Sequence, residues 1–297
     1  MNLTIIVVNF KSDKQKLQSC LNSINIHAEV LLIDHSHDFT FDGIEKPQNL
    51  NIRVIKNVNL GNGAGINCGA RNAKTRYILY LDIDTVLPPN FFEVLEITIK
   101  RISNFAVIAP KTDNIYDEIS LNKRGNLSIP QYYYNKFFFN INLEETKYPN
   151  LKEQFFVSGS IMLIDKYNTF DNGIKFDENI FLFFEENDFF HQCFKMKKKI
   201  YLIDNLLAYH HGGSLNDKSI NYECFKKWHW EWSKYYFLNK HYNKLIIFFI
   251  ALKSIFKYFF KSILYYFFDK DKNKIFKSRI DGLLCFYLNR KKILSFK

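Results

Sequence analysis

Short apolar runs alternate with segments of helical spacing along the first third of the chain. Residues 3–10, "LTIIVVNF", are mostly β-branched and apolar, which is typical of a buried strand in a parallel sheet. Residues 14–24 repeat apolar side chains at the spacing of an amphipathic helix. We predict further strands at residues 29–34, 51–57 and 77–82, and a closely packed helix that begins within residues 63–73. Strands that alternate with helices in this way predict βαβ units and a mainly parallel sheet.

The pattern becomes less regular after residue 110. Residues 111–150 have weak periodicity, and we expect long loops there with a short strand or helix. Residues 154–165 predict a strand pair or a strand and a turn, and residues 180–196 predict an apolar segment followed by a helix. Residues 199–214 predict a strand that ends in two histidines and two glycines. From residue 222 onward no strand period remains, so we predict helices.

One segment of the C-terminal part is unusually apolar. Residues 245–268 are mostly aliphatic and aromatic, but Lys253, Lys257 and Lys261 interrupt them at intervals of four. A transmembrane helix needs about 20 mainly apolar residues in a row, so this stripe of lysines argues against a membrane span. A basic stripe beside aromatic residues fits a helix that lies in the membrane interface.

Charge divides the chain into two parts. The 297 residues carry a net charge of +11. Residues 218–297 contain 18 Lys and Arg against 5 Asp and Glu, so this segment alone has a net charge of +13. Such a tail suits an anionic surface, either a membrane or a nucleic acid. The alternative is a helical cap or a dimer interface whose lysines are merely solvated.

The cysteines and the N-terminus indicate a reducing compartment. The five cysteines are scattered and form no C-x-x-C pair, which argues against a disulfide framework and a zinc site. The first apolar run is too short for a secretory signal and lacks a preceding basic region. We therefore expect a cytoplasmic protein.

Acidic side chains follow two of the predicted strands. Asp34 ends the second predicted strand, while Asp82 and Asp84 end the fourth. Ligands of such sheets bind at the carboxyl ends of the strands. Side chains two positions apart on a strand point to the same side, so a divalent cation would offset the repulsion between Asp82 and Asp84. A pair of solvated turn residues is the alternative.

Three further motifs are candidates for chemistry. The stretch "NLGNGAGINCG" lacks the glycine spacing of a dinucleotide-binding fingerprint, and it is typical of a tight turn with close helix packing. Glu185, Glu186 and Asp188 follow an apolar run, where a carboxylate can act as a general base, although acids also favour the first turn of any helix. His210 and His211 are candidates for metal or phosphate contact, or are ordinary loop residues.

The order of these motifs resembles that of the family 2 glycosyltransferases with the GT-A fold, especially the branch of bacterial rhamnosyltransferases of surface polysaccharide assembly. The matching stretches lie within residues 1–215 and read "TIIVVNFKSDKQKLQSCLNSI", "LLIDHSHD", "NLGNGAGINCGARNAKTRYILYLDIDT", "FDENIFLFFEENDF" and "AYHHGGS". The resemblance implies an α/β fold: a Rossmann-like, mainly parallel mixed sheet flanked by helices, with a C-terminal helical extension.

The same resemblance implies a division of the chain and of its tasks. Residues 1–217 would be the catalytic domain, with a nucleotide-sugar half at 1–105 and an acceptor half at 106–217. Residues 218–297 resemble that branch only in being helical and basic, and their charge and aromatic content lead us to expect a helical tail that associates with the membrane. The reaction would be an inverting transfer from a nucleotide-diphosphate sugar, with Mn²⁺ or Mg²⁺ as cofactor.

Roles are carried over residue by residue. Glu186 would be the general base, Asp188 would bind the acceptor or orient the base, and Glu185 would complete the catalytic acids. Asp84 would be the most direct metal ligand, joined by Asp82 and by His210 or His211. The nucleotide-sugar contacts would be Asn9, Asp34, Asn59, Gly61, Asn67, Arg71 and Asp82.

Three positions depart from the family pattern. His35 follows Asp34 where the family usually has Asn, and Glu186 stands where the base is usually Asp. Asp82 stands where the rhamnosyl branch often has Asn, which weakens the case for rhamnose more than that for glycosyl transfer.

We therefore predict a glycosyltransferase of cell-surface polysaccharide synthesis that acts on a saccharide acceptor, free or lipid-linked. dTDP-rhamnose is one candidate donor, and a UDP-hexose used for lipopolysaccharide or capsule is the alternative. The expected location is peripheral on the inner face of the bacterial cell membrane, with the tail on its anionic surface and no nucleic-acid partner. Two other classes stay open: a nucleic-acid-binding protein that uses the tail, and a catalytically silent protein that binds a nucleotide sugar.

Overall fold

The computed structural model describes residues 2–113, 146–212 and 219–290, so most of the predicted loops at 111–150 lie outside the described residues. The chain forms two compact units. The first comprises Met1–Val58, Gly65–Lys175 and Phe189–Leu215. The second comprises Asn59–Ala64, Phe176–Asp188 and Asn216–Lys297, so the three acids of the "FFEENDFF" stretch belong with the C-terminal helices.

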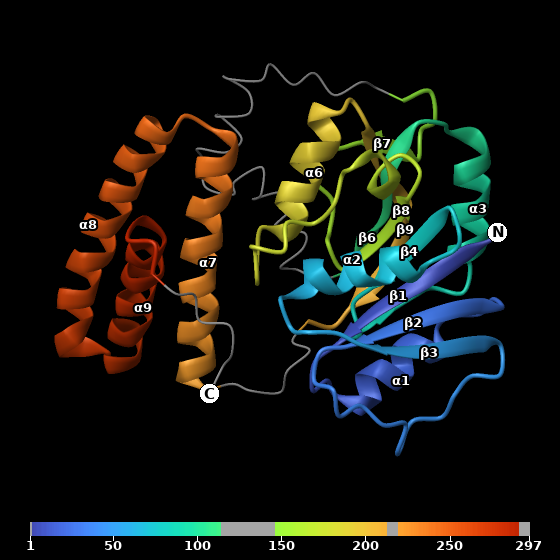
Figure 1. The fold of residues 1–297 in the computed structure, drawn as a ribbon, viewed down its shortest axis with the longest axis horizontal. Coiled ribbons are helices and arrows are strands. Elements are labelled where there is room, and N and C mark those ends of the chain that lie inside the picture. The colour runs from blue at the N-terminus through green and yellow to red at the C-terminus, as the bar shows by residue number, and fades with distance from the viewer. Residues whose placement is uncertain (1, 114–145, 213–218, 291–297) are drawn as a thin grey trace. The chain divides into compact units, whose positions relative to one another are not determined.

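One mixed sheet forms the centre of the first unit (Figure 1). Its strand order is β3-β2-β1-β4-β8-β6-β9-β5, with β7 paired to β9. The pairs among β3, β2, β1 and β4 are parallel, as is the β6–β9 pair, while β8 runs antiparallel between β4 and β6. The strands are β1 Leu3–Asn9, β2 Ala28–Asp34, β3 Leu50–Lys56, β4 Tyr77–Leu81, β5 Thr85–Val86, β6 Phe105–Thr112, β7 Leu151–Glu153, β8 Ile161–Asp165 and β9 Lys199–His210. The predicted mainly parallel mixed sheet is thus confirmed.

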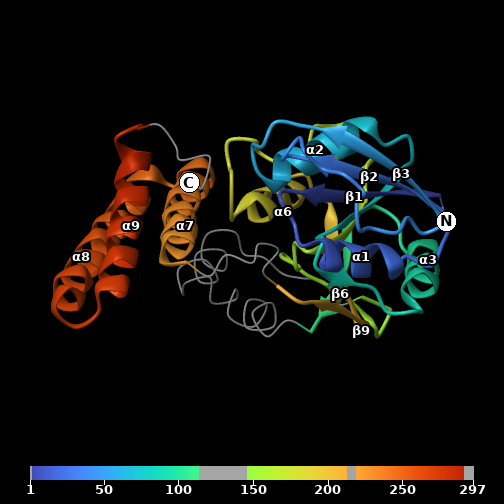
Figure 2. The same cartoon turned by 90° about the horizontal axis from the view of Figure 1, so that it is seen from below.

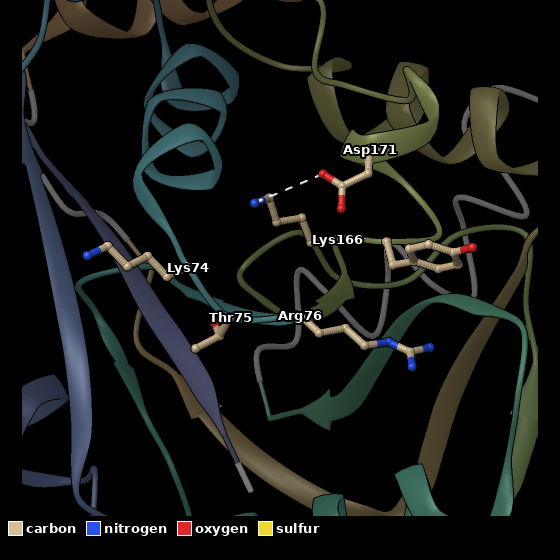
Figure 3. Close-up of a pocket in the computed structure, with 6 residues that line it drawn as sticks. Lys74, Thr75, Arg76, Lys166 and Asp171 are labelled. Carbon is tan, nitrogen blue, oxygen red and sulfur yellow. Dashed lines mark ion pairs between the residues drawn. The ribbon is translucent and has the colours of Figure 1, made fainter.

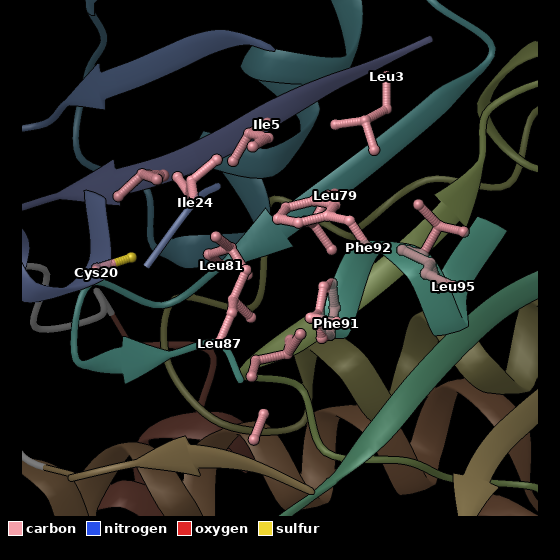
Figure 4. Close-up of a cluster of buried hydrophobic side chains, with 14 of the residues drawn as sticks. Leu3, Ile5, Cys20, Ile24, Leu79, Leu81, Leu87, Phe91, Phe92 and Leu95 are labelled. Atoms are coloured by element: carbon pink, nitrogen blue, oxygen red, sulfur yellow. The ribbon is translucent and has the colours of Figure 1, made fainter. Parts of the chain in front are cut away.

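Helices cover both faces of this sheet (Figure 2). They are α1 Lys14–Asn22, α2 Asn62–Asn72, α3 Phe91–Arg101 and α6 Glu185–Lys195, with a short 3₁₀ turn at Phe170–Asn172. Helix α1 begins where Asp13 accepts hydrogen bonds from the backbone amides of Gln15 and Lys16. Its apolar residues meet those of α3 in one large core on the same face of the sheet (Figure 4).

Helix α2 packs closely on the opposite face of β1. A Cβ atom on Gly69 would lie 2.5 Å from Cδ1 of Ile6, and one on Gly65 would lie 2.7 Å from Cγ2 of Val8. Only residues without a side chain allow the helix to approach the strand this closely. The prediction of close helix packing in the glycine-rich stretch is therefore confirmed.

Three helices make up most of the second unit: α7 Ile220–His241, α8 Lys244–Phe268 and α9 Lys270–Tyr287. The side chains of Asn243 and Asp269 cap α8 and α9 by accepting hydrogen bonds from their first amides. Buried Glu231 of α7 accepts hydrogen bonds from Tyr258 of α8 and Arg279 of α9, which ties the three helices together. The prediction of a helical C-terminal extension is confirmed.

Candidate functional site

The carboxyl end of β4 leads into a tight turn that carries two aspartates. Strand β4 ends at Leu81, and the backbone amide of Asp82 donates to the carbonyl of Ser160 at 2.8 Å. Thr85 closes the turn, because its hydroxyl donates to the carbonyl of Asp82 at 2.6 Å. The chain then forms the two-residue strand β5, which the sequence analysis did not predict, and Thr85 pairs there with His210 at the end of β9.

This pairing brings three candidate metal ligands together. One ligand atom from each of Asp82, Asp84 and His210 lies within 4.8 Å of the other two. Nε2 of His210 lies 3.4 Å from Oδ1 of Asp84 and 3.9 Å from Oδ2 of Asp82. Two carboxylates and one imidazole form a donor set that suits a divalent cation such as Mn²⁺, and the same carboxylates suit Mg²⁺.

Neighbouring groups keep Asp84 charged in spite of its burial. Its side chain is only 3% exposed, whereas that of Asp82 is 27% exposed and accepts a hydrogen bond from the Tyr80 hydroxyl. Burial alone would raise the pKa of Asp84, but the hydrogen bond and charge of His210 outweigh it, and Lys16 adds to their effect. The pKa of Asp84 therefore lies below its ordinary value, which keeps the carboxylate ready to bind a cation.

The end of β9 is fixed by backbone contacts on both sides of His210. The amide of His210 donates to Oδ1 of Asp113 at 2.9 Å, and the amide of His211 donates to the carbonyl of Asp84 at 3.0 Å. The side chain of His211 is exposed and is not part of the three-residue cluster. Of the two predicted histidines, the structure thus brings only His210 to the aspartates.

Asp34 lies at the carboxyl end of β2 and organises the loop that follows. Its carboxylate is fully buried and accepts hydrogen bonds from Asn9 at 2.9 Å, from the Ser36 hydroxyl at 2.6 Å and from the amide of Phe39 at 3.1 Å. Burial would raise the pKa of Asp34, but these hydrogen bonds lower it below its ordinary value. Asn9 and Asp34 are register partners on adjacent strands, so two predicted nucleotide contacts lie side by side.

The other predicted nucleotide contacts are spread over α2 and the turn before it. Asn67 is buried in α2, and Arg71 is exposed in its last turn. Oδ1 of Asn59 accepts a hydrogen bond from the amide of Gly61 at 3.2 Å. Gly61 has φ +100°, and a Cβ atom there would lie 2.0 Å from the carbonyl oxygen of Phe181, so this position requires glycine.

The segment before the three acids has an unusual backbone. Phe183 and Phe184 have φ values of +63° and +69°, a region that bulky residues rarely adopt. Such strain costs about 1–3 kcal/mol per residue and persists only where surrounding contacts hold it. Both rings pack against Trp230 of α7, with centroid distances of 5.3 and 5.2 Å. Ser233 of the same helix donates to the carbonyl of Leu182 at 2.8 Å.

The three acids themselves differ in their surroundings. Glu186 is partly exposed, Glu185 is 8% exposed and Asp188 is fully buried. The carboxylate of Asp188 lies 2.6 Å from Nε2 of His241 and accepts a hydrogen bond from Lys240 at 2.9 Å, both in the last turn of α7. Helix α7 therefore holds this segment at both ends, at the aromatic pair and at Asp188.

Several residues around these sites carry no recognisable signal in the sequence. Tyr80, Asp113 and Lys16 contact or influence the three candidate metal ligands, while Trp230, Lys240 and His241 support the segment that carries the acids. No short motif marks them, because each is brought to its partner by tertiary structure. The aromatic and basic composition of α7 was visible in the sequence, but it did not indicate contact with the acids.

A separate hollow of about 320 Å³ lies at the amino end of β4 (Figure 3). It is lined by Lys74, Arg76 and Lys166, and the last two have protein partners. Arg76 forms an ion pair with Asp165 at 2.7 Å, and Lys166 donates to the carbonyl of Ala73 at 3.1 Å and lies 4.0 Å from Asp171. None of the predicted site residues lines this hollow. The candidate site is thus at the opposite, carboxyl end of the strand.

Several solved structures have a similar fold. The chain resembles S. aureus TarS residues 1–349 in complex with UDP-GlcNAc, with a TM-score of 0.53 and 14% identity over 98% of this chain and 93% of that chain. It also resembles GalNAc-T7 with UDP, GalNAc and Mn²⁺, with a TM-score of 0.54 and 14% identity over 80% of this chain and 49% of that chain. At these identities the likeness shows the fold alone. The predicted GT-A fold is confirmed.

Sequence comparison identifies the family. A comparison with curated proteins gives no match. Residues 4–225 match the family model of Glycosyl transferase family 2, and they span three quarters of the chain, from β1 into α7. This range includes the aspartate pair after β4, the acids at the start of α6 and the histidine at the end of β9. The chain belongs to glycosyltransferase family 2.

Proposed function

We propose that the protein transfers a sugar from a nucleotide-diphosphate sugar to a hydroxyl group of a saccharide acceptor, with inversion at the anomeric carbon. The observation that carries the proposal is the meeting of Asp82, Asp84 and His210 from separate segments of the chain. This donor set lies at the carboxyl end of a sheet strand, where ligands of α/β sheets bind. A divalent cation held there would neutralise the leaving diphosphate as a Lewis acid.

The chain's own residues share the binding of the donor. Asp84 is the main cation ligand, and His210 and Asp82 complete the set, with Asp82 also reaching the ribose. Asn9 and Asp34 shape the pocket for the base and ribose, supported by the hydrogen bonds that hold the loop after β2. Asn59, Gly61, Asn67 and Arg71 are proposed to contact the donor through α2 and the turn before it. Asn59 and Gly61 follow the carboxyl end of β3 in the chain, which supports this role for them, whereas Arg71 lies in the last turn of α2, toward the amino end of β1.

Glu186 is proposed as the general base. It removes the proton of the acceptor hydroxyl while that oxygen attacks the anomeric carbon from the face opposite the diphosphate. Its partial exposure supports access to an acceptor. Asp188 is buried between Lys240 and His241, which supports an orienting role for it over direct acceptor binding. Glu185, also buried, is proposed to assist in holding the same segment.

The acceptor is proposed to be a lipid-linked saccharide at the inner face of a bacterial membrane, in the synthesis of surface polysaccharide. The basic C-terminal segment supports this choice, because lipid-linked acceptors carry anionic diphosphates in an anionic leaflet. dTDP-rhamnose and UDP-hexoses are the donors to compare first. A small difference in sugar substituents changes binding little, so measurement decides between them.

A donor panel tests the proposal. The purified protein is incubated with dTDP-, UDP- and GDP-sugars and either Mn²⁺ or Mg²⁺, and the release of nucleoside diphosphate is measured with and without a membrane extract as acceptor source. We expect one nucleotide class to be turned over, with loss of activity when the metal is chelated. Absence of turnover with every donor, even with the extract, contradicts the proposal. An Asp84→Asn variant that is as active as the wild type contradicts the metal-site assignment.

A further inference from the structure

Helix α8 is buried along a single narrow stripe. Its buried residues are Ile247, Ala251, Tyr258 and Ser262, which recur at intervals of four and seven and therefore share one side of the helix. Twelve large apolar side chains of the same helix are exposed, against eight in the rest of the described chain. They are Leu245, Ile246, Phe248, Phe249, Phe256, Phe259, Phe260, Ile263, Leu264, Tyr266, Phe267 and Phe268.

The exposed side chains include a continuous outer stripe. Leu245, Phe249, Phe256, Phe260, Ile263 and Phe267 follow one another at intervals of three, four or seven residues, on the side of α8 roughly opposite the buried stripe. Phe260 is 66% and Phe267 is 75% exposed. Exposed apolar patches of this extent mark interaction surfaces in soluble proteins.

Lysines flank the outer stripe on one side. Lys253, Lys257 and Lys261 are exposed, and they lie between the outer stripe and the buried stripe. Helix α8 has four lysines and no acidic residue along its 25 residues. The surface therefore combines an apolar band with a row of uncompensated positive charge.

This combination favours one of three possible binding partners for the outer face of α8: a second copy of the helix, a nucleic acid or a lipid surface. A second copy of α8 would bring only cations to a shared seam, where paired helices normally place opposite charges. A nucleic acid would leave a continuous apolar stripe without a partner, since single strands bind aromatic rings set within a basic groove. An anionic lipid surface matches both features, because acyl chains accept the apolar band and headgroup phosphates accept the lysines.

We infer that α8 lies flat on an anionic lipid bilayer, with its outer stripe in the acyl-chain boundary and Lys253, Lys257 and Lys261 at the level of the phosphates. Among the helices in the described part of the chain, none has the length and apolarity that a transmembrane span requires. The helix is about 37 Å long, which gives an extended line of contact. The inference deepens the proposed function and rests on it only for the identity of the membrane, since the surface itself is independent of the catalytic chemistry.

Flotation with lipid vesicles tests the inference. The full-length protein is mixed with vesicles of phosphatidylcholine alone or with added phosphatidylglycerol, at low and at high salt. We expect binding to the anionic vesicles that high salt weakens, and little binding to neutral vesicles. This series requires no substitution, so its outcome does not depend on the folding of a variant. Equal binding to both vesicle types, or no binding to either, overturns the inference.

Matched variants locate the surface. Two triple variants are each expected to lower vesicle affinity about 100-fold: Phe249→Ser/Phe260→Ser/Phe267→Ser and Lys253→Gln/Lys257→Gln/Lys261→Gln. For the lysine variant this follows because each lysine contributes about fivefold to binding at an anionic surface. The control for the aromatic variant is Val58→Ser/Tyr167→Ser/Met196→Ser, whose side chains are more than half exposed in the first unit. The control for the lysine variant is Lys147→Gln/Lys195→Gln/Lys197→Gln. Both controls are expected to bind like the wild type.

The readouts separate this inference from the proposed function. The α8 variants are expected to release nucleoside diphosphate from a donor, in the absence of vesicles, at the wild-type rate. If the wild type binds vesicles but turns over no donor, the proposed function is contradicted and the inferred membrane surface stands. If the aromatic variant instead converts a wild-type dimer to a monomer in sedimentation and vesicle binding is unchanged, the occupant is a second copy and the inference is wrong.

Discussion

Asp84 and Asp188 are both buried aspartates in predicted motifs, yet their surroundings are opposite. Asp84 shares its site with a second carboxylate, and Nε2 of His210 lies 3.4 Å from its Oδ1. Asp188 lies between two basic side chains, His241 at 2.6 Å and Lys240 at 2.9 Å. The first arrangement has excess negative charge that a cation can offset, whereas the second is compensated by the protein itself.

The comparison shows that position in a motif does not determine the role of an acid. Both residues belong to short acidic motifs that the resemblance assigns to the active site. The structure distinguishes them by what lies around each carboxylate. We therefore expect substitutions at Asp84 to affect chemistry before stability, and substitutions at Asp188 to affect stability before chemistry.

The largest effect is expected from Asp84→Asn. The change keeps the shape of the side chain but removes the charge that binds the cation, and metal-ion catalysis contributes several kcal/mol, so kcat/KM should fall about 10³-fold or more. Steady-state kinetics and calorimetric titration with Mn²⁺ measure the loss. Asp171→Asn, an exposed acid in the same unit, serves as the control. Unchanged Mn²⁺ affinity in Asp84→Asn would show that the cation binds elsewhere.

Glu186→Gln is expected to have the next largest effect. It removes the proposed general base but not the donor site, so kcat should fall about 10²–10⁴-fold with little change in KM for the donor. Glu186→Asp, which introduces the family's usual residue, should retain part of the activity. The pH dependence of its kcat should be closer to that of the wild type than the pH dependence of Glu186→Gln is. Glu185→Gln makes the same change at the adjacent acid and serves as the matched control. A larger loss in Glu185→Gln than in Glu186→Gln reverses the assignment.

Asp188→Asn should separate stability from chemistry. Removal of one partner from a buried ion pair costs about 3–5 kcal/mol. We expect a loss toward the lower end of this range, because buried His241 loses its charged acceptor while Lys240 keeps Asp177. We expect a lower unfolding midpoint and a fall in kcat of about tenfold with KM for the donor unchanged. Urea unfolding and kinetics are measured on the same preparation. If KM for the acceptor rises instead and stability is unchanged, Asp188 binds the acceptor directly.

A double-mutant cycle shows whether Asp188 acts through α7. Asp188→Asn combined with Lys240→Met should cost less than the sum of the two single changes, because both changes remove the same contact between Asp188 and Lys240. Lys240→Arg is the conservative rescue and should retain most of the kcat. Strictly additive losses would show that Asp188 and Lys240 act independently.

Local patterns predicted many elements of the fold. The apolar runs of β1, β2 and β4 and the spacing of α1 identified the sheet, because a buried strand and an amphipathic helix each have a distinct period. Asp82 and Asp84 were expected together because of their spacing in the chain. What the sequence did not show was β5, a strand of two residues whose only signal is its pairing with the end of β9.

Contacts made by tertiary structure were not predictable in the same way. Lys240 and His241 lie more than 50 residues after Asp188, and nothing in either segment identifies the other as a partner. The left-handed backbone of Phe183 and Phe184 could not be predicted, since local preference opposes it. Choosing His210 over His211 likewise required the register of β9 against β5, because a shift of one residue exchanges their sides.

The smallest predicted effect is an acid-dependent loss of stability on the Asp188 side. Burial would raise the pKa of Asp177, but hydrogen bonds from Lys240, the amide of Asn179 and Tyr236 lower it below its ordinary value. A lowered pKa in the fold contributes stability above the ordinary value of about 3.9 and loses it as the pH falls through the folded pKa. Urea unfolding from pH 6 to pH 3 should therefore show a steeper loss for the wild type than for Asp177→Asn. The two curves should approach each other at the acid end, since a protonated Asp177 resembles the amide, and curves that stay parallel would show that Lys240 does not stabilise the charge of Asp177.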